Sequence, residues 1–511
     1  MAEVAPPATF RGMNAATGAE LEPGYESSAI EDIGAACAAA EAAFDAFRDA
    51  DGQKRARLLE AIAEEVLALG DALLERAHLE TGLPLTRLAG ERGRTVAQLR
   101  LFAELVKSDS WRGVRIDPAQ PERSPAPRPD LRLRMVPLGP VAVFGASNFP
   151  LAFSTAGGDT ASALSAGCPV VVKGHPAHPG TDLMVAGAIQ QAVAKTGLPK
   201  GIFGHVRGPG HELGAALVRD RRIAAVGFTG SRSGGLALMR LCQERDIPIP
   251  VYAEMSSINP VIILPKALAS RGATLGQEFV QSLTLGAGQF CTNPGLVLAI
   301  DGPGLDRFIE SAAAALEGHA PQPMLTGGIR QAYTQGTSAL RSHPAVRALA
   351  RGLEGDGKTR EMAQLFATDA KAFVADPSLG EEVFGASSLI VRCSSPADLR
   401  KAIARLEGQL TITLQMDDGD ADDARPLLSV LERKAGRLLA NGWPTGVEVG
   451  HAMVHGGPYP ATSDSRSTSV GTLAIDRFLR PVCYQDFPPS LLPLELRDDA
   501  DVPKLVNGKP A

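Results

Sequence analysis

The sequence predicts an α/β enzyme with more than one domain, and three observations support this. The chain has 511 residues, which exceeds the size of a single compact core. Between 131 and 254, short apolar strands alternate with predicted helices, a pattern typical of a parallel sheet with helices on both faces. A second α/β series occupies about 296–440, beyond a glycine-rich loop around Cys291.

The first hundred residues predict amphipathic helices at 26–50, 54–78 and 90–107, with leucines at helical spacing in the second. They show no pattern that suggests chemistry, so we expect them to cover one side of the next domain. The segment 117–130 is rich in proline, which excludes a helix and predicts an extended arm.

The first series begins at Leu131–Val136, where apolar residues alternate with arginine as in a half-exposed antiparallel strand. Sheets of the parallel kind bind ligands beyond the carboxyl ends of their strands. The remaining strands are expected at Val141–Phe144, Pro169–Lys173, 202–206, Ile223–Phe228 and Val251–Ala253, and the helices at 151–166, 181–195, 211–219 and 232–245.

The second series is less regular. Residues 319–365 give no clear pattern, and the chain from about 442 is rich in glycine and proline. It closes on a polar tail, Glu495–Asp501, that we expect to be an arm or loosely ordered. Strands are expected near 296–300, 371–375, 388–392, 410–415 and 437–440, and helices at 304–317 and 396–406.

Composition excludes several classes of partner. The net charge is −6 and there is no basic block, so neither nucleic acid nor an anionic membrane is expected as a partner. Six cysteines without C-x-x-C spacing argue against a metal site or a disulfide framework and fit a reducing compartment. There is no secretory signal and no apolar run that could span a membrane. These features predict a cytoplasmic enzyme.

The loop Gly286–Gly295, G-A-G-Q-F-C-T-N-P-G, is the strongest candidate for a catalytic centre. Glycines allow backbone angles that can push the thiol of Cys291 towards a cleft. A free cysteine can also be a small apolar side chain without chemistry. The residues that follow the predicted strands favour the catalytic interpretation.

Each predicted strand end of the first sheet is followed by a group that could act on a ligand. Asn148 could donate to an oxyanion or cap a helix, and Lys173 would point towards the ligand crevice. The turn Thr229–Gly235 could bind a phosphate at a helix N-terminus or be an ordinary tight turn. Glu254 alone would be dismissed as a surface carboxylate. Together with Cys291, they supply a nucleophile, an oxyanion donor, a general base and a dinucleotide site.

With these motifs in order, the chain resembles the aldehyde dehydrogenase superfamily from about residue 10 to 485. Gly288–Cys291 matches the family's nucleophile loop. A-E-M-S-S-I-N-P, containing Glu254, matches its general-base segment, with two serines and an isoleucine in place of two glycines and a lysine. A-S-N-F-P, containing Asn148, matches the oxyanion asparagine.

The same resemblance implies the cofactor site. Lys173 matches the lysine on the adenosine ribose, with His175 close behind it. F-T-G-S-R-S-G-G matches the phosphate turn, through Gly230, Ser231 and Gly235. The E-V-F-G segment resembles one whose Glu and Phe hold the nicotinamide ribose, here Glu382 and Phe384.

The family's fold implies a Rossmann-like cofactor domain, an α/β catalytic domain and a small antiparallel oligomerisation element. The expected domains are 1–117 with 138–254 for the cofactor, 255–441 for catalysis and 118–137 with 480–500 for the oligomerisation arm. Residues 442–479 would form the substrate-tunnel loop and the return to the cofactor domain. We expect a homo-dimer or homo-tetramer, because the alternating strand beside the arm exposes an edge.

The implied reaction oxidises an aldehyde to a carboxylic acid. The thiolate of Cys291 would attack the aldehyde, Asn148 would stabilise the oxyanion, and Glu254 would activate water to release the acid from a thioester. An acylating enzyme that passes the thioester to coenzyme A is an alternative, as is a catalytically silent binding homologue. The presence of Glu254, the base needed for hydrolysis, argues against the first alternative, and intact Cys291, Asn148 and Glu254 argue against the second.

The expected cofactor is NADP, with NAD possible. NAD-preferring relatives commonly carry a glutamate three residues after the ribose lysine, where it repels a 2′-phosphate, and this chain has Pro176 there. Arg207, just after the next predicted strand, is placed to approach such a phosphate. An exposed Arg207 without a ligand is the competing interpretation.

The substrate is inferred from the run Gly145–Thr181, which resembles the branch of 2,5-dioxovalerate (α-ketoglutarate semialdehyde) dehydrogenases and some NADP-linked fatty aldehyde dehydrogenases. Phe149 and Phe153 could line either kind of pocket. The loop His455–Arg466 is rich in hydroxyls and carries Arg466. Because polar groups facing an alkyl chain would be left unpaired, the sequence favours the short oxo-acid aldehyde and Arg466 as its partner.

Overall fold

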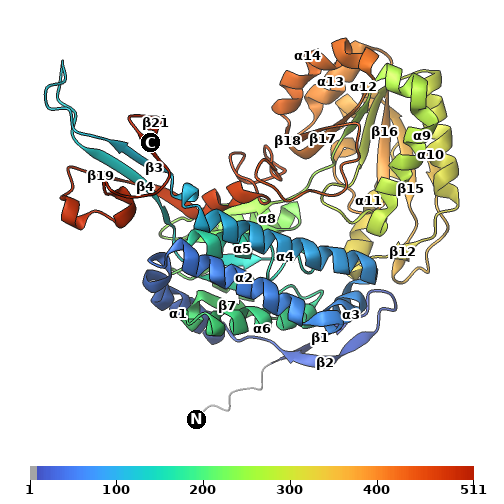
Figure 1. Cartoon of the computed structure of the whole chain (residues 1–511). Coiled ribbons are helices and arrows are strands. Elements are labelled where there is room, and N and C mark those ends of the chain that lie inside the picture. The colour runs from blue at the N-terminus through green and yellow to red at the C-terminus, as the bar shows by residue number, and fades with distance from the viewer. Residues whose placement is uncertain (1–7) are drawn as a thin grey trace.

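The structure is a computed structural model that describes residues 8–511. The described chain forms three large sheets and two small two-stranded ones. Figure 1 shows an α/β body built on one sheet, a second α/β body beside it, and a third sheet that projects away from both. The predicted fold class, α/β with a small additional sheet, is confirmed. No helix within this range is long and apolar enough to cross a membrane.

The helices of the first half are α1 (Ile30–Arg48), α2 (Gly52–Ala68), α3 (Gly70–Thr81), α4 (Leu85–Lys107), α5 (Gly158–Ala166), α6 (Pro179–Lys195), α7 (His211–Arg219) and α8 (Arg232–Gln243). Those of the second half are α9 (Pro265–Thr284), α10 (Pro303–Glu317), α11 (Gly327–Ser342), α12 (Ala370–Ala375), α13 (Pro396–Arg405) and α14 (Ala421–Glu432).

The first sheet is parallel, in the order β7-β6-β5-β8-β9. Its strands are β5 (Val141–Phe144), β6 (Val170–Lys173), β7 (Phe203–Val206), β8 (Ala225–Thr229) and β9 (Val251–Glu254). Val141 and Val143 pack under α2, α4 and α6, whereas Ala142 between them packs towards α1, α7 and α8. This alternation explains why both faces of the strand are apolar. The strand order reverses at β5, which places a crevice at the carboxyl ends of the strands.

The second sheet has the order β13-β15-β16-β11-β10-β17-β18 and is parallel except for its edge strand β13. Apolar clusters cover both faces. Its strands are β10 (Val261–Ile263), β11 (Leu296–Ile300), β13 (Arg347–Arg351), β15 (Gln364–Asp369), β16 (Ser387–Cys393), β17 (Gln409–Gln415) and β18 (Ala435–Ala440).

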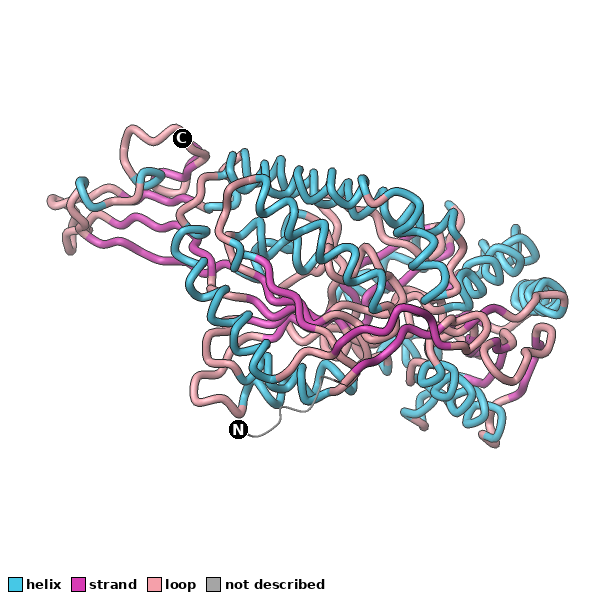
Figure 2. Tube along the Cα trace, turned by 90° about the horizontal axis from the view of Figure 1, so that it is seen from below, coloured by secondary structure: helices cyan, strands magenta, loops and turns pink. Residues whose placement is uncertain are grey.

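The third sheet, in the order β19-β4-β3-β20-β21, brings the C-terminal segment against residues 114–137. Figure 2 shows it extending from one end of the molecule. Its strands are β3 (Val114–Asp117), β4 (Leu131–Pro137), β19 (Leu479–Gln485), β20 (Lys504–Val506) and β21 (Lys509–Pro510). The two small sheets pair β1 (Thr9–Met13) with β2 (Glu20–Glu26) and β12 (Gln322–Pro323) with β14 (Arg360–Glu361).

Two predicted helices have different bounds in the structure. The helix expected at 54–78 is two helices, because the chain turns at Gly70, whose φ of 60° suits glycine. The helix expected at 151–166 begins only at Gly158. The preceding residues form turns, and the backbone N–H groups of Leu151 and Ala152 donate to the buried Glu91 carboxylate of α4 at 2.8 and 3.0 Å.

One strand prediction in the second half was wrong. The strand expected at 371–375 is the helix α12, since the Asp369 side chain accepts from the N–H of Ala372 and caps a helix there. Of the two alternatives for the polar tail Glu495–Asp501, an arm or a loosely ordered segment, the structure favours the arm. The Glu495 carboxylate pairs with Arg112 and Arg134 at 2.9 and 2.5 Å, and strands β20 and β21 follow it.

Candidate active site

Cys291 lies in the loop between α9 and β11, and its side chain is half-buried. The loop begins with a 3-10 turn, η3 (Leu285–Gly288), in which Gly286, Ala287 and Gly288 all have positive φ. A Cβ on Gly288 would lie 2.4 Å from the backbone of Gly385 and Ala386. Only glycine therefore lets this loop pack against the segment that carries Glu382 and Phe384.

Asn259 holds the backbone of the nucleophile loop. Its Nδ2 donates to the carbonyls of Cys291 and Asn293 at 2.8 and 3.0 Å. Asn259 has a φ of 48°, a conformation that asparagine tolerates better than most residues. Its own N–H donates to Oε1 of Gln409 on β17 at 3.0 Å, and that oxygen also accepts from Ser257 and Ile258. The second sheet thus fixes both the Glu254 segment and the Cys291 loop.

His455 lies between the predicted nucleophile and the predicted base. Its Nε2 is 3.4 Å from Sγ of Cys291 and 3.1 Å from Oε2 of Glu254. His455 and Glu254 are 1% and 3% exposed, so bulk water does not screen this contact. Within residues 8–511, these three residues are the one cluster of potential metal ligands, with ligand atoms within 4.8 Å of one another. The same geometry can relay a proton between thiol and carboxylate.

The electrostatics of Cys291 disfavour a free thiolate. Burial raises the pKa of the thiol well above its usual range, and the carboxylates of Glu254 and Glu382 raise it further. The guanidinium groups of Arg94 and Arg437 act in the opposite direction. At neutral pH the thiol is therefore protonated, and attack on a carbonyl requires a base close to Sγ. The imidazole of His455 occupies that position.

Asn148 lies on the other side of the Cys291 loop and is buried. Its Nδ2 donates to the carbonyl of Gln289 at 3.0 Å, and its own carbonyl accepts from Arg87 at 2.9 Å. The next residue, Phe149, packs edge-on against Phe290 with ring centroids 5.3 Å apart. The structure thus brings the predicted oxyanion donor beside the nucleophile loop.

Phe149 and Phe153 form an aromatic pair with centroids 5.3 Å apart. The ring of Phe153 also contacts His455 at 6.0 Å. Segments of the predicted tunnel loop pack against this pair through Val447, Val449, Met453 and Val470. The two phenylalanines predicted to line the substrate path therefore lie next to Cys291 and His455.

The carboxyl ends of the first sheet lie in register. Phe144 pairs with Lys173 and with Phe228, and Thr229 pairs with Glu254. Lys173 is largely buried, which lowers its pKa, while Asp182 and Glu212 raise it. His175 stacks on His178 at 5.2 Å, and burial lowers the pKa of His175 to about 3, so its ring is neutral.

Two glycines in the turn after β8 pack closely against neighbouring side chains. A Cβ on Gly235 would lie 2.6 Å from Sδ of Met255, directly after Glu254. A Cβ on Gly230 would meet the Phe228 ring at 2.7 Å. Ser231 caps α8 by accepting from the N–H of Gly234. The helix N-terminus and this glycine turn fit a phosphate, and the serine also serves the helix itself.

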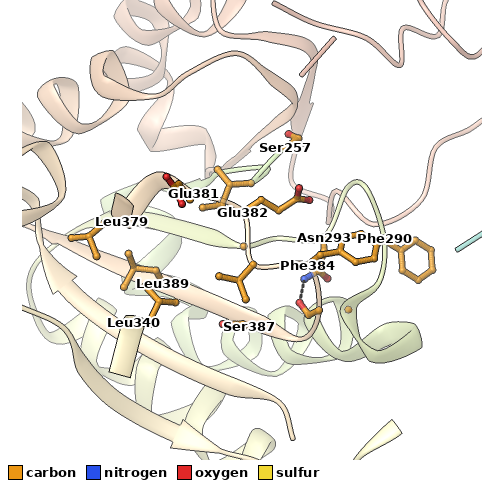
Figure 3. A pocket seen from close by; sticks show the side chains of 15 residues that line it. Ser257, Phe290, Asn293, Leu340, Leu379, Glu381, Glu382, Phe384, Ser387 and Leu389 are labelled. Carbon is orange, nitrogen blue, oxygen red and sulfur yellow. Dashed lines mark hydrogen bonds between the residues drawn. The ribbon is translucent and has the colours of Figure 1, made fainter. Parts of the chain in front are cut away.

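Glu382 and Phe384 line a pocket together with Ser257, Phe290 and Asn293 (Figure 3). Burial raises the pKa of Glu382 to about 8, and the Glu254 carboxylate raises it too. Asn293 donates to the carbonyl of Gly385 at 3.1 Å and joins this segment to the cysteine loop. Residues of the cysteine loop and Glu382, whose carboxyl group is protonated at pH 7, therefore line the same pocket.

The two predicted arginines differ in their surroundings. Arg207 follows β7, and its Nε donates to the carbonyl of Glu26 at 3.0 Å. Lys173 at the end of β6 pairs with Val206 at the end of β7, and Arg207 is the next residue after Val206. The side chain of Arg466 is 90% exposed and lies 3.5 Å from Asp464. The prediction that Arg466 lines the substrate path is corrected: the guanidinium faces solvent, and nothing draws it towards Cys291.

Sequence reasoning missed several residues of the site. His455 opens the loop singled out for its hydroxyls, but it is distant in sequence from Cys291 and no spacing rule connects them. Asn259 and Gln409 act through backbone contacts that leave no sequence signal. Arg87, Glu91 and Arg94 follow the i, i+4, i+7 spacing of one face of α4, a helix expected to carry no chemistry.

Comparison with known proteins finds similarities over most of the chain. A model described as the aldehyde dehydrogenase family matches residues 5–325. The chain is 57% identical over 504 residues to alpha-ketoglutaric semialdehyde dehydrogenase 2 of Azospirillum brasilense, covering 98% of this chain and 96% of that one. It is 48% identical over 487 residues to alpha-ketoglutaric semialdehyde dehydrogenase of Acinetobacter baylyi, covering 95% and 92%. Among solved structures, PnpE from Pseudomonas sp. WBC-3 aligns with a TM-score of 0.79 at 21% identity, covering 94% of this chain and 95% of that one.

Proposed function

Since this chain belongs to the aldehyde dehydrogenase family, we propose that it oxidises α-ketoglutarate semialdehyde (2,5-dioxovalerate) to 2-oxoglutarate through a thioester on Cys291. The two relatives named for this aldehyde match nearly the whole chain at 57% and 48% identity. The observation that carries the chemistry is the contact of His455 with both Cys291 and Glu254, at 3.4 and 3.1 Å.

His455 first makes the thiol nucleophilic. The raised pKa of Cys291 keeps the thiol protonated, so Nε2 of His455 accepts that proton as Sγ attacks the aldehyde carbon. The resulting imidazolium lies beside the buried Glu254 carboxylate, which stabilises it electrostatically. The imidazole of His455 can thus take the proton of Cys291 while it contacts the carboxylate of Glu254.

The developing oxyanion needs hydrogen-bond donors at the nucleophile loop. One N–H of the Asn148 amide donates to Gln289, and within residues 8–511 the other N–H makes no recorded hydrogen bond. We assign that free N–H, with the backbone N–H of Cys291, to the oxyanion. Each such donor contributes about 3 kcal/mol to lowering the barrier.

The described residues fit a nicotinamide dinucleotide. The glycine turn and the N-terminus of α8 suit a phosphate, Lys173 lies at the aligned strand ends, and Glu382 lines the pocket beside the cysteine loop. A nicotinamide held by these residues would supply the hydride acceptor that oxidation of the thiohemiacetal to the thioester requires. We place the dinucleotide there on the basis of these residues and of membership in the aldehyde dehydrogenase family.

Glu254 completes the reaction. After the thioester has formed, its carboxylate takes a proton from water, which then attacks the acyl carbon and releases the acid. A carboxylate held 3.1 Å from His455 and 3% exposed is suited to this role. Because hydrolysis needs such a base, its presence argues against transfer of the acyl group to coenzyme A.

We propose NADP as the preferred cofactor, on the basis of Pro176 and Arg207. No carboxylate occupies position 176, and Nε of Arg207 is held by Glu26 at the end of β2, close to the strand end that carries Lys173. Comparison of kcat/KM for NADP and NAD tests this. Arg207→Ala should lower kcat/KM for NADP and leave that for NAD nearly unchanged, whereas a clear preference of the wild type for NAD would refute the proposal.

The substrate is tested by kcat/KM for α-ketoglutarate semialdehyde against decanal. We expect the oxo-acid aldehyde to be preferred, in agreement with the two relatives. If decanal is preferred, the fatty-aldehyde alternative takes its place. If neither aldehyde reduces NADP or NAD, the chain is a silent homologue.

We also propose that the chain assembles into a homo-dimer or homo-tetramer through the third sheet. Its edge strand β19 pairs only with β4 within the described residues, and Phe487, Leu491 and Leu494 just beyond it are exposed. An edge of this kind favours pairing with a second chain. A monomer by light scattering at micromolar concentration would contradict this. The six cysteines, all unpaired, support our proposal of a cytoplasmic location.

A further inference from the structure

Arg94 on α4 is a charged side chain without a matching charge. Its Nη2 donates to the carbonyl of Val447 at 3.4 Å, and this is its one recorded hydrogen bond within residues 8–511. Its Nη1 is buried and has no partner there. A buried guanidinium N–H without an acceptor is costly. Such a group in a native protein indicates a ligand that supplies the acceptor.

The position of Arg94 connects this unpaired donor to the reacting thiol. Its guanidinium carbon lies 4.9 Å from the ring centroid of Phe153, and the same ring contacts His455 at 6.0 Å. One aromatic side chain therefore separates the cation from the Cys291–His455 pair. The charge of Arg94 is also close enough to lower the pKa of Cys291, against the effect of burial.

Neighbouring charges do not neutralise Arg94. Glu91, one turn earlier on α4, uses Oε1 to accept from the N–H groups of Leu151 and Ala152. Burial lowers the pKa of Arg94, and the charges of Glu91 and Glu448 act in the opposite direction from a distance. No carboxylate of the described chain forms an ion pair with Arg94. The guanidinium is therefore available to an incoming anion.

Two other arginines near the site have different tasks. Arg87 donates to the Asn148 carbonyl and stacks on Phe290 at 4.4 Å. Its Nη1 is also buried without a partner within residues 8–511, but it lies against Gly286, where an added Cβ would be 2.5 Å away. Arg437 uses Nε, Nη1 and Nη2 to hold Thr411, Gly446 and Pro444. Both position parts of the active site, and each of the three guanidinium nitrogens of Arg437 already donates to the protein.

We propose that Arg94 binds the carboxylate of the 2-oxo acid substrate and orients the aldehyde at its other end towards Cys291. This inference rests on the proposed function and specifies what selects its substrate. The ring of Phe153 lies along the short carbon chain, and Nη1 of Arg94 donates to the carboxylate. The charge that the sequence suggested for Arg466 is supplied instead from α4.

The test compares two aldehydes of equal chain length in the wild type and in Arg94→Met, which keeps an apolar stem against Phe153. The probes are α-ketoglutarate semialdehyde, which carries the carboxylate, and pentanal, which does not. A charge-assisted hydrogen bond predicts a loss of roughly 10- to 100-fold in kcat/KM for the semialdehyde. For pentanal, kcat/KM should stay within about threefold, which also shows that the variant folds. Arg94→Lys should recover part of the loss, because it restores the charge without the fork.

Arg437→Met is the matched control, because it removes a buried arginine whose donors serve the protein. We expect it to lower kcat/KM for both aldehydes alike. As a second readout, inhibition by 2-oxoglutarate should weaken in Arg94→Met by a similar factor. The proposal is overturned if Arg94→Met reduces both aldehydes equally, or leaves the semialdehyde unaffected. If the wild type oxidises pentanal but not the semialdehyde, both the proposed substrate and the proposed role of Arg94 are overturned.

Discussion

The Nε2 atom of His455 lies 3.4 Å from Sγ of Cys291 and 3.1 Å from Oε2 of Glu254. The nucleophile comes from the second α/β body, the carboxylate from the end of β9 in the first, and the imidazole from the loop that returns between them. One imidazole therefore connects the group that forms the thioester with the group that hydrolyses it.

The first prediction concerns this imidazole. His455→Asn should lower kcat/KM for the aldehyde by roughly 10²- to 10⁴-fold at pH 7, because no other base accepts the thiol proton. The loss should shrink as the pH rises, since the raised pKa of Cys291 is approached and the thiol ionises unaided. The measurement is the pH profile of kcat/KM. His451→Asn, on the same loop but exposed, is the control. Parallel profiles for His455→Asn and the wild type would exclude His455 as the base.

The second prediction concerns Glu382, whose pKa is raised to about 8. A raised pKa means that the carboxyl is neutral below about pH 8 and ionised above it. An ionised carboxylate accepts hydrogen bonds from ribose hydroxyls more strongly than the neutral acid. Cofactor binding, measured by fluorescence titration, should therefore tighten by roughly 5-fold relative to Glu382→Gln as the pH rises from 7 to 9. A wild-type to variant ratio that does not change with pH would remove Glu382 from the ribose site.

The third prediction concerns Gln409, whose Oε1 accepts from Ser257, Ile258 and Asn259. Gln409→Leu leaves two buried backbone N–H groups unsatisfied, at a cost of about 1–3 kcal/mol each. We expect a lower Tm in calorimetry and a lower kcat, because Asn259 then holds the Cys291 carbonyl less firmly. Gln243→Leu, at an exposed position, should change neither. If Gln409→Leu is destabilised but its kcat is unchanged, Gln409 stabilises the fold without positioning the Cys291 loop.

The strands of the first sheet were predictable because apolar runs bounded by turns leave a strong local pattern. Strand β5 and helix α7 have the bounds that the sequence predicts. The start of α5 was not predictable, since the turns before it depend on a carboxylate from α4. The run 371–375 was predicted as a strand because a short apolar run fits either element, whereas Asp369 caps a helix there.

For the site, the residues that follow strands could be found and those that act across the fold could not. Glu254 lies at the end of its strand, and Lys173 pairs with Phe144 at the same sheet edge. His455 and Arg94 reach the thiol only because a late loop and an early helix meet at Phe153. Arg466 was predicted to bind the substrate because its loop is polar. The direction in which its side chain points depends on the tertiary fold, which composition does not describe.

The most direct test of the account is a single-turnover experiment with Glu254→Gln. Mixed with α-ketoglutarate semialdehyde and NADP, this variant should give a burst of at most one reduced cofactor per subunit. Mass spectrometry should then find the acyl group on the peptide that contains Cys291, because the thioester forms and is not hydrolysed. Cys291→Ala should give neither burst nor adduct. Steady turnover in Cys291→Ala, or an adduct on another residue, would contradict the central claim that Cys291 carries the reaction.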